Sequence, residues 1–286
     1  MGRHTPGDII VMGETKVLIV IPARYASTRL PAKPLQLIKG KPMIQRVAEI
    51  AAFVCKQNDA CSYVVATDHP AIEDFCKSHN MKVVMTSEAC RNGTERCWEA
   101  ANKRDNKPQL IINLQGDNPL CPPWILQNII DEWTRDKSAA VYTPCVLLDW
   151  AAYEKMAEAK KVTPYSGTTV LTDNKNYALA FSKSILPAIR KPEEARRAYP
   201  EKSPVRRHIG LYAYTCEALE TYFSLEESIY EKGYIEGLEQ MRFLYNGLKI
   251  KMVDVDYHGR ETTNGVDSPE DILRVEAIIN QYGELI

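Results

Sequence analysis

The sequence lacks the features that mark several classes of protein. Its 36 Lys and Arg residues are matched by 37 Asp and Glu, so no excess charge holds a nucleic acid or an anionic membrane. Its longest apolar runs, such as VLIVI at 17–21, are far shorter than the roughly 20 residues that span a bilayer. Its eight cysteines form no CxxC pair, which argues against a zinc site or a disulfide framework. We therefore expect reduced thiols in a cytoplasmic protein, without nucleic-acid partners or membrane insertion.

Residues 1–15 also lack the apolar stretch of a secretory signal, and we expect them to form a disordered tail or extension. Hydrophobic residues make up 45% of the chain and charged residues 26%, close to the averages of soluble globular proteins. No internal repeat or low-complexity linker divides the remainder. We therefore predict a single domain over 16–286, with a region inserted at about 150–214.

Strand and helix patterns alternate through the first half of the chain. The apolar, β-branched run at 16–22 predicts a strand buried on both faces. Apolar residues at helical spacing predict a helix at 41–54. By the same criteria, strands are predicted at 62–67, 82–86, 109–114 and 139–144, and helices at 70–78, 93–103 and 122–135. Such repeated units predict an α/β fold with a mostly parallel, doubly wound sheet.

The second half of the chain is less regular. Between about 150 and 214, short strands are predicted in a mixed or antiparallel region that covers one side of the main sheet, at 169–172, 177–182 and 208–214. The basic stretch 190–207 is interpreted as a solvated loop beside a cleft. After it, a strand is expected at 250–256 and helices at 216–223, 234–245 and 268–281.

The loop after the first strand has the composition of a phosphate site. It contains neither GxxxxGK[ST] nor GxGxxG, which argues against a P-loop or a Rossmann dinucleotide site. Ligands of open α/β sheets bind at the carboxyl ends of parallel strands. There, Arg24 and Arg29 suit phosphate oxygens, and Lys33 supplies a point charge. Pro31 and Pro34 restrict the backbone, so a loop positioned to bind a polyphosphate is favoured. The alternative hypothesis, a solvated basic loop, stays open.

An acid follows another buried strand, the one that ends at Leu114. Asp117 stands beside Gly116, which allows a ligand to approach the backbone closely. Because Mg²⁺ typically takes one or two carboxylates together with phosphate oxygens and water, a second acid is expected elsewhere, and Asp267 is the candidate. Taken alone, Asp267 is more typical of a turn or a helix start.

Eight motifs follow one another along the chain: PARYASTRLPAKPL, GKPMIQRV, YVVATD, GTER, NLQGDNP, RHIGLYAY, LEQMRFL and GVDSPEDI. In this order they strongly resemble the 3-deoxy-manno-octulosonate (Kdo) cytidylyltransferases, from about residue 17 to residue 279. The resemblance implies a Rossmann-like nucleotidyltransferase fold with an inserted acceptor and dimerisation region, usually as a homodimer. It also implies an enzyme that uses Mg²⁺ to couple CTP to the anomeric hydroxyl of Kdo and releases pyrophosphate. The product, CMP-Kdo, would be used in lipopolysaccharide assembly.

The same resemblance assigns roles to residues of the matching motifs. Arg24, Lys33, Asp117 and Asp267 would be catalytic, and the two aspartates would ligate Mg²⁺. The sugar hydroxyl would attack the α-phosphorus in line, while Arg24 and Lys33 stabilise the departing pyrophosphate. The nucleotide site would comprise Arg24, Ser27, Arg29, Lys33, Thr67, Asp68, Thr94, Arg96 and Gln115. The acidic-sugar site would comprise Arg207, His208, Tyr212, Glu236 and Gln240, with Arg207 as the partner of the acceptor carboxylate.

Several of the implied acceptor residues also have structural interpretations. His208 precedes an apolar strand and is equally typical of a buried structural histidine. Glu236 and Gln240, one helical turn apart in the predicted helix, fit a solvated face. Tyr212 fits the core of the same apolar strand. For these residues both interpretations stay open.

Four positions depart from the family pattern. Asn118 replaces an acid, Ala32 replaces a glycine, and Thr169 and Lys183 replace a lysine and an arginine. The changes concentrate on the acceptor half, so CMP transfer to a different acidic acceptor also stays open: 8-amino-Kdo, another ulosonic acid or a phosphonate. A nucleotidyltransferase for a neutral sugar 1-phosphate and a non-catalytic nucleotide sensor are two further hypotheses. The presence of both candidate metal ligands argues against the sensor.

Overall fold

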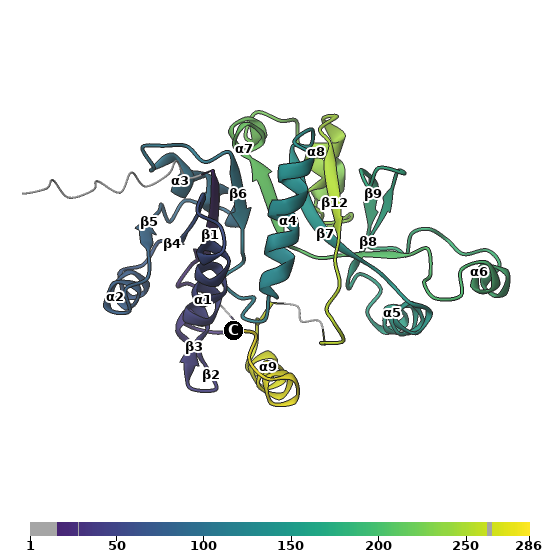
Figure 1. Cartoon of the computed structure of the whole chain (residues 1–286), viewed down its shortest axis with the longest axis horizontal. Coiled ribbons are helices and arrows are strands. Elements are labelled where there is room, and N and C mark those ends of the chain that lie inside the picture. Colours follow the sequence, from purple (N-terminus) through teal and green to yellow (C-terminus); the bar gives the residue numbers. More distant parts are fainter. Residues whose placement is uncertain (1–15, 28, 262–264) are drawn as a thin grey trace, which may run out of the picture.

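The structure is a computed structural model, and it describes residues 16–27, 29–261 and 265–286. Over these residues, a ten-stranded sheet runs through the centre of the molecule (Figure 1). Its order is β5-β4-β1-β6-β11-β7-β10-β8-β9, and β12 also pairs with β7. The strands are β1 (Val17–Ala23), β4 (Cys61–Thr67), β5 (Val83–Met85), β6 (Leu110–Asn113), β7 (Val141–Leu147), β8 (Thr168–Thr172), β9 (Ala178–Ser182), β10 (Arg206–His208), β11 (Tyr212–Thr215) and β12 (Ile250–Asp254). The tail predicted at 1–15 lies outside the described residues.

The parallel part of the sheet is built from the predicted strand–helix units. β1 pairs in parallel with β4 on one side and with β6 on the other, and β5 continues the sheet beyond β4. The residues of β1 from Val17 to Ile21 are all buried. Because both faces of such a strand are covered by helices, its sequence shows no polar alternation. The strand predicted at 16–22 is therefore confirmed.

Helices cover both faces of the sheet (Figure 1). α1 (Met43–Lys56), α2 (Pro70–Ser78) and α4 (Pro123–Arg135) contribute to one core, together with Ile19 and Ile21 of β1. α3 (Gly93–Asn102), α7 (Cys216–Tyr222) and α8 (Met241–Tyr245) contribute to the other core, together with Leu18 and Val20. Alternate residues of one strand thus belong to two separate cores, and the predicted α/β, doubly wound fold class is confirmed.

Beyond β6 the sheet becomes mixed, because β12 pairs with β7 in parallel while the other added strands are antiparallel. β11 lies antiparallel between β6 and β7, and β10, β8 and β9 follow in antiparallel succession. The prediction that this region covers one side of the sheet is wrong, because its strands extend the sheet edge to edge. The strand predicted at 208–214 is two strands, since the Leu211 N–H donates to the carbonyl of Ile209 at 2.8 Å and makes a local turn between them.

Two further predictions for the second half are wrong, and one helix there is not predicted. The helix at 234–245 is reduced to α8, because Gly237 has a φ of +62°, in the left-handed region. An unpredicted helix, α5 (Trp150–Val162), lies where the inserted region is predicted to begin, and among its residues only Trp150 is buried, so little apolar periodicity marks it. The basic stretch 190–207 contains α6 (Pro192–Ala198) and β10 rather than one loop.

The last helix, α9 (Pro269–Tyr282), begins as its sequence predicts. Ser268 caps it and exchanges hydrogen bonds with Asp271, and Pro269 occupies its first turn. Its apolar face forms a third core with Leu30 and with the hairpin of β2 (Leu37–Ile38) and β3 (Lys41–Pro42). The last helix thereby packs on the segment that follows β1. No helix in the part of the chain that the structure describes is long and apolar enough to cross a membrane.

Candidate active site

A polar cleft of about 320 Å³ opens at the carboxyl ends of β1 and β6, where open α/β sheets bind ligands. Arg24 and Lys33 line it from the segment after β1, and Gln115 and Asp117 line it from the turn after β6. Asp267 enters from the segment before α9. Side chains that are far apart in the sequence, and that the resemblance groups together, thus share one cleft.

Lys33 lies between the two candidate metal ligands. Its Nζ is 2.6 Å from Asp117 Oδ2 and 2.9 Å from Asp267 Oδ1, and Arg29 reaches the other oxygen of Asp267 at 3.1 Å. The side chains of Lys33 and Asp117 are mostly buried, whereas that of Arg29 is mostly exposed. Because Coulomb attraction grows as water is excluded, the ion pair of Lys33 with Asp117 is the strongest of these three contacts.

A backbone contact brings the two aspartates together. The N–H of Val266 donates to the carbonyl of Asp117 at 2.8 Å, and a Cβ on Gly265 would lie 3.0 Å from Asp117 Oδ1. Asp271, in the first turn of α9, accepts a hydrogen bond from the Asp267 N–H at 2.9 Å. The start of the last helix therefore fixes the position of the second acid.

Two backbone positions beside the cleft are sterically special. A Cβ on Gly116 would lie 2.6 Å from the carbonyl oxygen of Pro22, so only glycine allows β1 and the turn after β6 to approach this closely. Ala32 has a φ of +49°, directly before the 3-10 turn η1 (Lys33–Leu35). That left-handed conformation favours glycine, the residue that Ala32 replaces in the family pattern.

Arg96 forms a buried part of the cleft wall. Its guanidinium donates to Asp68 Oδ2 at 2.7 Å and to Thr86 Oγ1 at 2.6 Å. The Asp68 carboxylate also accepts from the Tyr25 N–H at 3.4 Å. A buried guanidinium needs such partners, since an unpaired buried charge is costly. Of these two predicted nucleotide residues, Arg96 lines the cleft, whereas Asp68 is outside the lining and holds the Arg96 guanidinium by a hydrogen bond.

Four other predicted nucleotide residues are absent from the cleft lining: Ser27, Arg29, Thr67 and Thr94. Thr67 and Thr94 are buried, and Thr94 Oγ1 lies 3.3 Å from the Tyr214 hydroxyl. Ser27 Oγ accepts from the Leu30 N–H at 3.3 Å, within the loop after β1. In this structure these hydroxyls therefore hold the loops and the core that surround the cleft.

The start of α3 adds cleft residues that the sequence analysis does not predict. Arg91, Asn92 and Gly93 line the cleft, and the Asn92 side chain caps the helix by accepting from the Glu95 N–H at 2.9 Å. A Cβ on Gly93 would lie 3.2 Å from the side chain of Gln115. A helix N-terminus offers free N–H groups and a positive dipole end to an anion. Asn92, directly before the predicted helix at 93–103, is the sequence signal for it.

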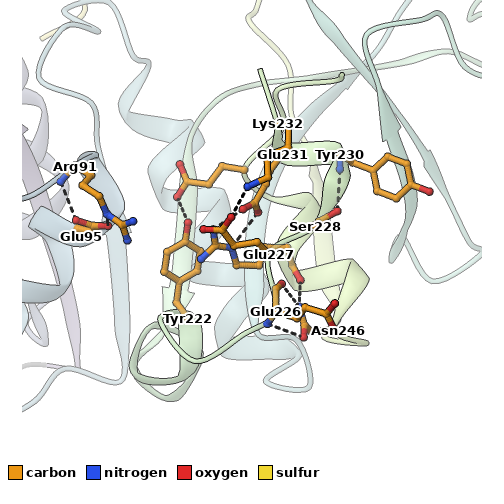
Figure 2. Close-up of polar contacts among 12 residues, drawn as sticks. Arg91, Glu95, Tyr222, Glu226, Glu227, Ser228, Tyr230, Glu231, Lys232 and Asn246 are labelled. Carbon is orange, nitrogen blue, oxygen red and sulfur yellow. Dashed lines mark hydrogen bonds and ion pairs between the residues drawn. The ribbon is translucent and has the colours of Figure 1, made fainter. Parts of the chain in front are cut away.

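A charged cluster holds the segment between α7 and α8 (Figure 2). Glu227 pairs with Lys232, and Glu231 accepts from Arg242 Nε at 2.9 Å. The pKa of Glu227 is lowered chiefly by Lys232, and more weakly by Arg242 and by the cleft residue Arg91. These ion pairs, in place of the predicted long helix, order the segment that leads to Glu236 and Gln240, two of the predicted acceptor residues.

Three of the predicted acceptor residues meet on one face of the sheet. The Tyr212 hydroxyl donates to Gln240 Oε1 at 3.1 Å, and the His208 ring lies 5.4 Å from the Tyr212 ring. Gln240 Nε2 is a buried donor with no partner among the described atoms, so it is free to donate a hydrogen bond. Burial, helped by Lys183, lowers the pKa of His208 to about 3, so its imidazole is neutral at physiological pH. It contacts Thr143 Oγ1 at 2.8 Å.

Glu236 lies beside the same region but not on a helix. Its carboxylate accepts from Ser182 Oγ at 2.8 Å and from the Lys183 N–H at 2.7 Å. The prediction that Glu236 and Gln240 share a helix face is wrong, because the chain turns between them at Gly237. Glu236 instead ties this turn to the end of β9.

Arg207 is separated from its neighbour His208. Successive strand residues point to opposite faces of a sheet, and Arg207 lies near Tyr257, which packs on the core that α1 and α4 cover. Burial lowers the pKa of Arg207, and its Nε is buried with no partner in the described structure. The structure therefore does not bring Arg207 together with the cluster of His208, Tyr212 and Gln240.

The donor set of the two aspartates fits a magnesium site. Both carboxylates reach one cationic atom, Lys33 Nζ, within 3 Å, so they converge on a single cation position. Mg²⁺ is usually bound by one or two carboxylates and completes its coordination with phosphate oxygens and water. This site has two carboxylates, and no group of three or more His, Cys, Asp or Glu side chains that could hold a metal occurs in the described ranges.

The sheet, its cationic cleft and the pair of acids define the class of a nucleotidyltransferase. Comparisons with known proteins agree. The family model "Cytidylyltransferase" matches residues 18–250. A 3-deoxy-manno-octulosonate cytidylyltransferase of Maricaulis maris is 42% identical, over 94% of this chain and 99% of the relative. The mitochondrial 3-deoxy-manno-octulosonate cytidylyltransferase of Arabidopsis thaliana is 34% identical, over 93% and 84%.

A solved structure is also similar. It is a CMP:2-keto-3-deoxy-manno-octonic acid synthetase in complex with CTP, with a TM-score of 0.79 and 35% identity over 93% of this chain and 99% of that chain. This chain therefore belongs to the cytidylyltransferase family and, within it, to the 3-deoxy-manno-octulosonate cytidylyltransferases. The predicted family is confirmed.

Proposed function

We propose that this protein transfers the cytidylyl group of CTP to the anomeric hydroxyl of Kdo, giving CMP-Kdo and pyrophosphate for lipopolysaccharide biosynthesis. The relatives named for this reaction align over nearly the whole chain, and the similar solved structure binds CTP. Within the structure, the observation that carries the proposal is Lys33 held between Asp117 and Asp267 in a cleft with further cations. A triphosphate and its metal require such an arrangement of charges.

The cations of the cleft would bind and orient the triphosphate. Arg24 and Lys33 would neutralise the β- and γ-phosphates and stabilise the departing pyrophosphate, while Arg29 stands at the exposed rim. Arg96, already fixed by Asp68, adds a preorganised charge to the wall. With the α-phosphorus held in line with the sugar hydroxyl, catalysis results from positioning and charge neutralisation, and no protein nucleophile is needed.

Asp117 and Asp267 would hold Mg²⁺, which supplies charge neutralisation at the α-phosphate and favours deprotonation of the attacking hydroxyl. For the carboxylates to do so, Lys33 must transfer its ion pairs from the aspartates to the phosphates. Its long, flexible side chain suits this exchange better than an arginine would. The backbone contact of Val266 with Asp117 keeps the acids adjacent throughout.

The cluster of His208, Tyr212 and Gln240 is proposed to bind the acidic sugar. The unpaired Gln240 Nε2 and the neutral imidazole of His208 supply hydrogen bonds to sugar hydroxyls. Glu236 positions this turn through Ser182 and Lys183. Arg207 remains a proposed carboxylate partner on the strength of the resemblance and of its unpaired Nε, but its side chain lies on the opposite side of the sheet from this cluster.

One observation favours a second candidate acceptor. Lys183, which replaces an arginine of the family pattern, donates from its N–H to Glu236 and from its Nζ to Thr168 Oγ1 at 3.1 Å. Thr169, which replaces a lysine, donates to the carbonyl of Ser184 at 2.7 Å. Both departures therefore border the acceptor region, and a related acid, such as 8-amino-Kdo, another ulosonic acid or a phosphonate, is the alternative substrate.

The homodimer and the cytoplasmic location are also proposals. The inserted region carries largely exposed apolar side chains that a second copy of the chain would cover: Val162, Tyr165, Leu179 and Tyr199. The eight free thiols suit a reducing compartment. Light scattering after size-exclusion chromatography tests the dimer, which has twice the chain mass of 32.4 kDa.

The test of the activity is pyrophosphate release with CTP and Mg²⁺ across five acceptors: Kdo, 8-amino-Kdo, a sialic acid, a phosphonate and a sugar 1-phosphate. We expect the highest kcat/KM with Kdo, and no release by Asp117→Asn. A higher value with another acid would identify the alternative substrate. Preference for the sugar 1-phosphate would overturn the acidic acceptor, and binding of CTP without turnover of any acceptor would indicate a sensor.

A further inference from the structure

Two thiols lie against each other at the far end of the sheet from the active site. Cys55 Sγ is 3.1 Å from Cys61 Sγ. Cys55 belongs to the last turn of α1, and Cys61 is the first residue of β4. Both side chains are half-buried, so solution reagents reach them. The proposed reaction uses neither residue.

The turn between them holds the two backbones in place. The Asn58 N–H donates to the carbonyl of Cys55 at 3.3 Å, and the Cys61 N–H donates to the carbonyl of Asn58 at 2.9 Å. The Asn58 side chain also donates to the carbonyl of Val54 at 2.8 Å. The sulfur atoms therefore meet in a preorganised turn, and little chain entropy is lost when they are joined.

The surroundings distinguish the two sulfurs. The hydrogen bond from Cys61 lowers the pKa of Cys55, against the opposing effect of burial, and Lys82 adds a smaller electrostatic contribution in the same direction. The same hydrogen bond and burial raise the pKa of Cys61. Because the thiolate is the nucleophile in thiol–disulfide exchange, Cys55 is the attacking group and Cys61 the resolving group.

We propose that Cys55 and Cys61 are a dithiol modification site that forms an intramolecular disulfide by exchange with a low-molecular-weight disulfide, such as glutathione disulfide. The Cys55 thiolate attacks one glutathione sulfur and expels a glutathione thiolate. The Cys61 sulfur, after losing its proton, attacks Cys55 Sγ and expels the second glutathione thiolate. Two protein thiols are thereby oxidised, one glutathione disulfide is reduced to two thiols, and the two protons pass to the glutathione thiolates.

The bond would tie α1 to β4 without disturbing the cleft. Cys61 pairs with Val17 at the start of β1, whereas the cleft lies beyond the other end of both strands. At 3.3 Å per residue, Cys61 and Thr67 are about 20 Å apart along β4. We therefore expect the disulfide to raise thermal stability and to leave nucleotide binding unchanged. This proposal does not depend on the acceptor of the enzyme.

The test is incubation of the whole protein with glutathione buffers of increasing oxidised fraction, followed by thiol blocking, mass spectrometry and thermal unfolding. We expect a loss of two hydrogen masses and a tryptic link between residues 47–56 and 57–77, with fragmentation placing the bond at Cys61 rather than Cys76. The melting temperature should rise by about 5 °C. Cys216→Ser, at another half-buried thiol, is the matched control and should behave like the wild type.

Cys55→Ser and Cys61→Ser should each abolish the internal link and the rise in melting temperature. If one variant does not fold, the other provides the same comparison. Stable glutathione adducts on Cys55 with no internal link, or an equal rise in melting temperature in a Cys→Ser variant of this pair, would overturn the proposal.

Discussion

Lys33 Nζ lies 2.6 Å from Asp117 Oδ2, and the same ammonium group reaches Asp267 at 2.9 Å. A cation from the chain therefore stands where the two acids converge. Lys33 offsets part of the negative charge of the two acids in the free protein, and the same side chain is the proposed partner of the triphosphate. Lys33 therefore contacts both the acid that follows β6 and the acid that precedes α9.

Asp117→Asn and Asp267→Asn should each reduce turnover by about a hundredfold or more, because each removes the negative charge of a proposed metal ligand with little change in side-chain volume. The fold should persist, as circular dichroism and the melting temperature would show. Pyrophosphate release at saturating Mg²⁺ measures the effect. Turnover similar to the wild type in either variant would remove that residue from the proposed metal site.

Lys33→Ala should impair both CTP binding and turnover, with KM for CTP raised about tenfold, since a phosphate partner worth about 1.4 kcal/mol is lost. Initial rates at varied CTP give KM and kcat. Lys103→Ala, at the exposed end of α3, is the control and should leave both unchanged. If the kinetics of Lys33→Ala equal those of the wild type, the loop after β1 is only a solvated basic loop.

Lys33→Met should tighten divalent-cation binding in the free protein, because Asp117 and Asp267 then lose their internal counter-cation. We expect about tenfold tighter binding of Mn²⁺, followed by electron paramagnetic resonance without nucleotide. The Asp267→Asn/Lys33→Met double variant should lose the gain. Equal Mn²⁺ affinity in the wild type and in Lys33→Met would show that Lys33 does not compete for this position.

Ala32→Gly should stabilise the protein by about 1 kcal/mol, because Ala32 adopts a left-handed φ of +49° that costs a non-glycine residue about this much. For a chain of this size the melting temperature should rise by about 2–4 °C. Ala26→Gly, in the same loop but without a positive φ, is the comparison and should not stabilise. A melting temperature unchanged or lowered by Ala32→Gly would contradict the strain.

The half-buried His208 should make the protein less stable in weak acid. Its folded pKa of about 3 is below the ordinary 6.5, so between these values the unfolded chain binds a proton that the folded chain does not. Stability therefore falls as the pH drops below 6.5, by about 2 kcal/mol from pH 7 to pH 5 for this one group. Urea unfolding at both pH values should show a smaller difference for His208→Gln. His79→Gln, at an exposed histidine, should show the wild-type difference.

The sequence predicts the parallel part of the fold well because its local signals agree with its tertiary contacts. The run of β1 is apolar throughout since the strand is buried on both faces, and the Ser268–Asp271 pair marks the start of α9 by local capping. The pattern fails where tertiary contacts decide. The segment 226–240 is ordered by the ion pairs of Glu227 and Arg242 rather than by a helical face.

The candidate site is predictable to the same degree. Arg24, Lys33 and Asp117 follow buried strands, and the rule for ligands at strand ends finds them. The approach of Asp267 to Asp117 depends on one hydrogen bond from Val266 between distant segments, and no local pattern encodes it. Nor does spacing reveal that Arg207 and His208, adjacent in sequence, face opposite sides, because the strand predicted at 208–214 leaves Arg207 outside it, whereas β10 includes both.

The docking of α9 determines when, during synthesis, the candidate site can be completed. On the ribosome, the loop after β1 emerges early, and the strands that complete the parallel sheet follow it. Asp267 emerges late and reaches its place only when Val275, Ile278 and Ile279 dock beside Leu30. A nascent chain would thus have the proposed nucleotide-binding loop well before it has both acids. The proposed cytidylyl transfer would begin only after α9 has packed against the loop that follows β1.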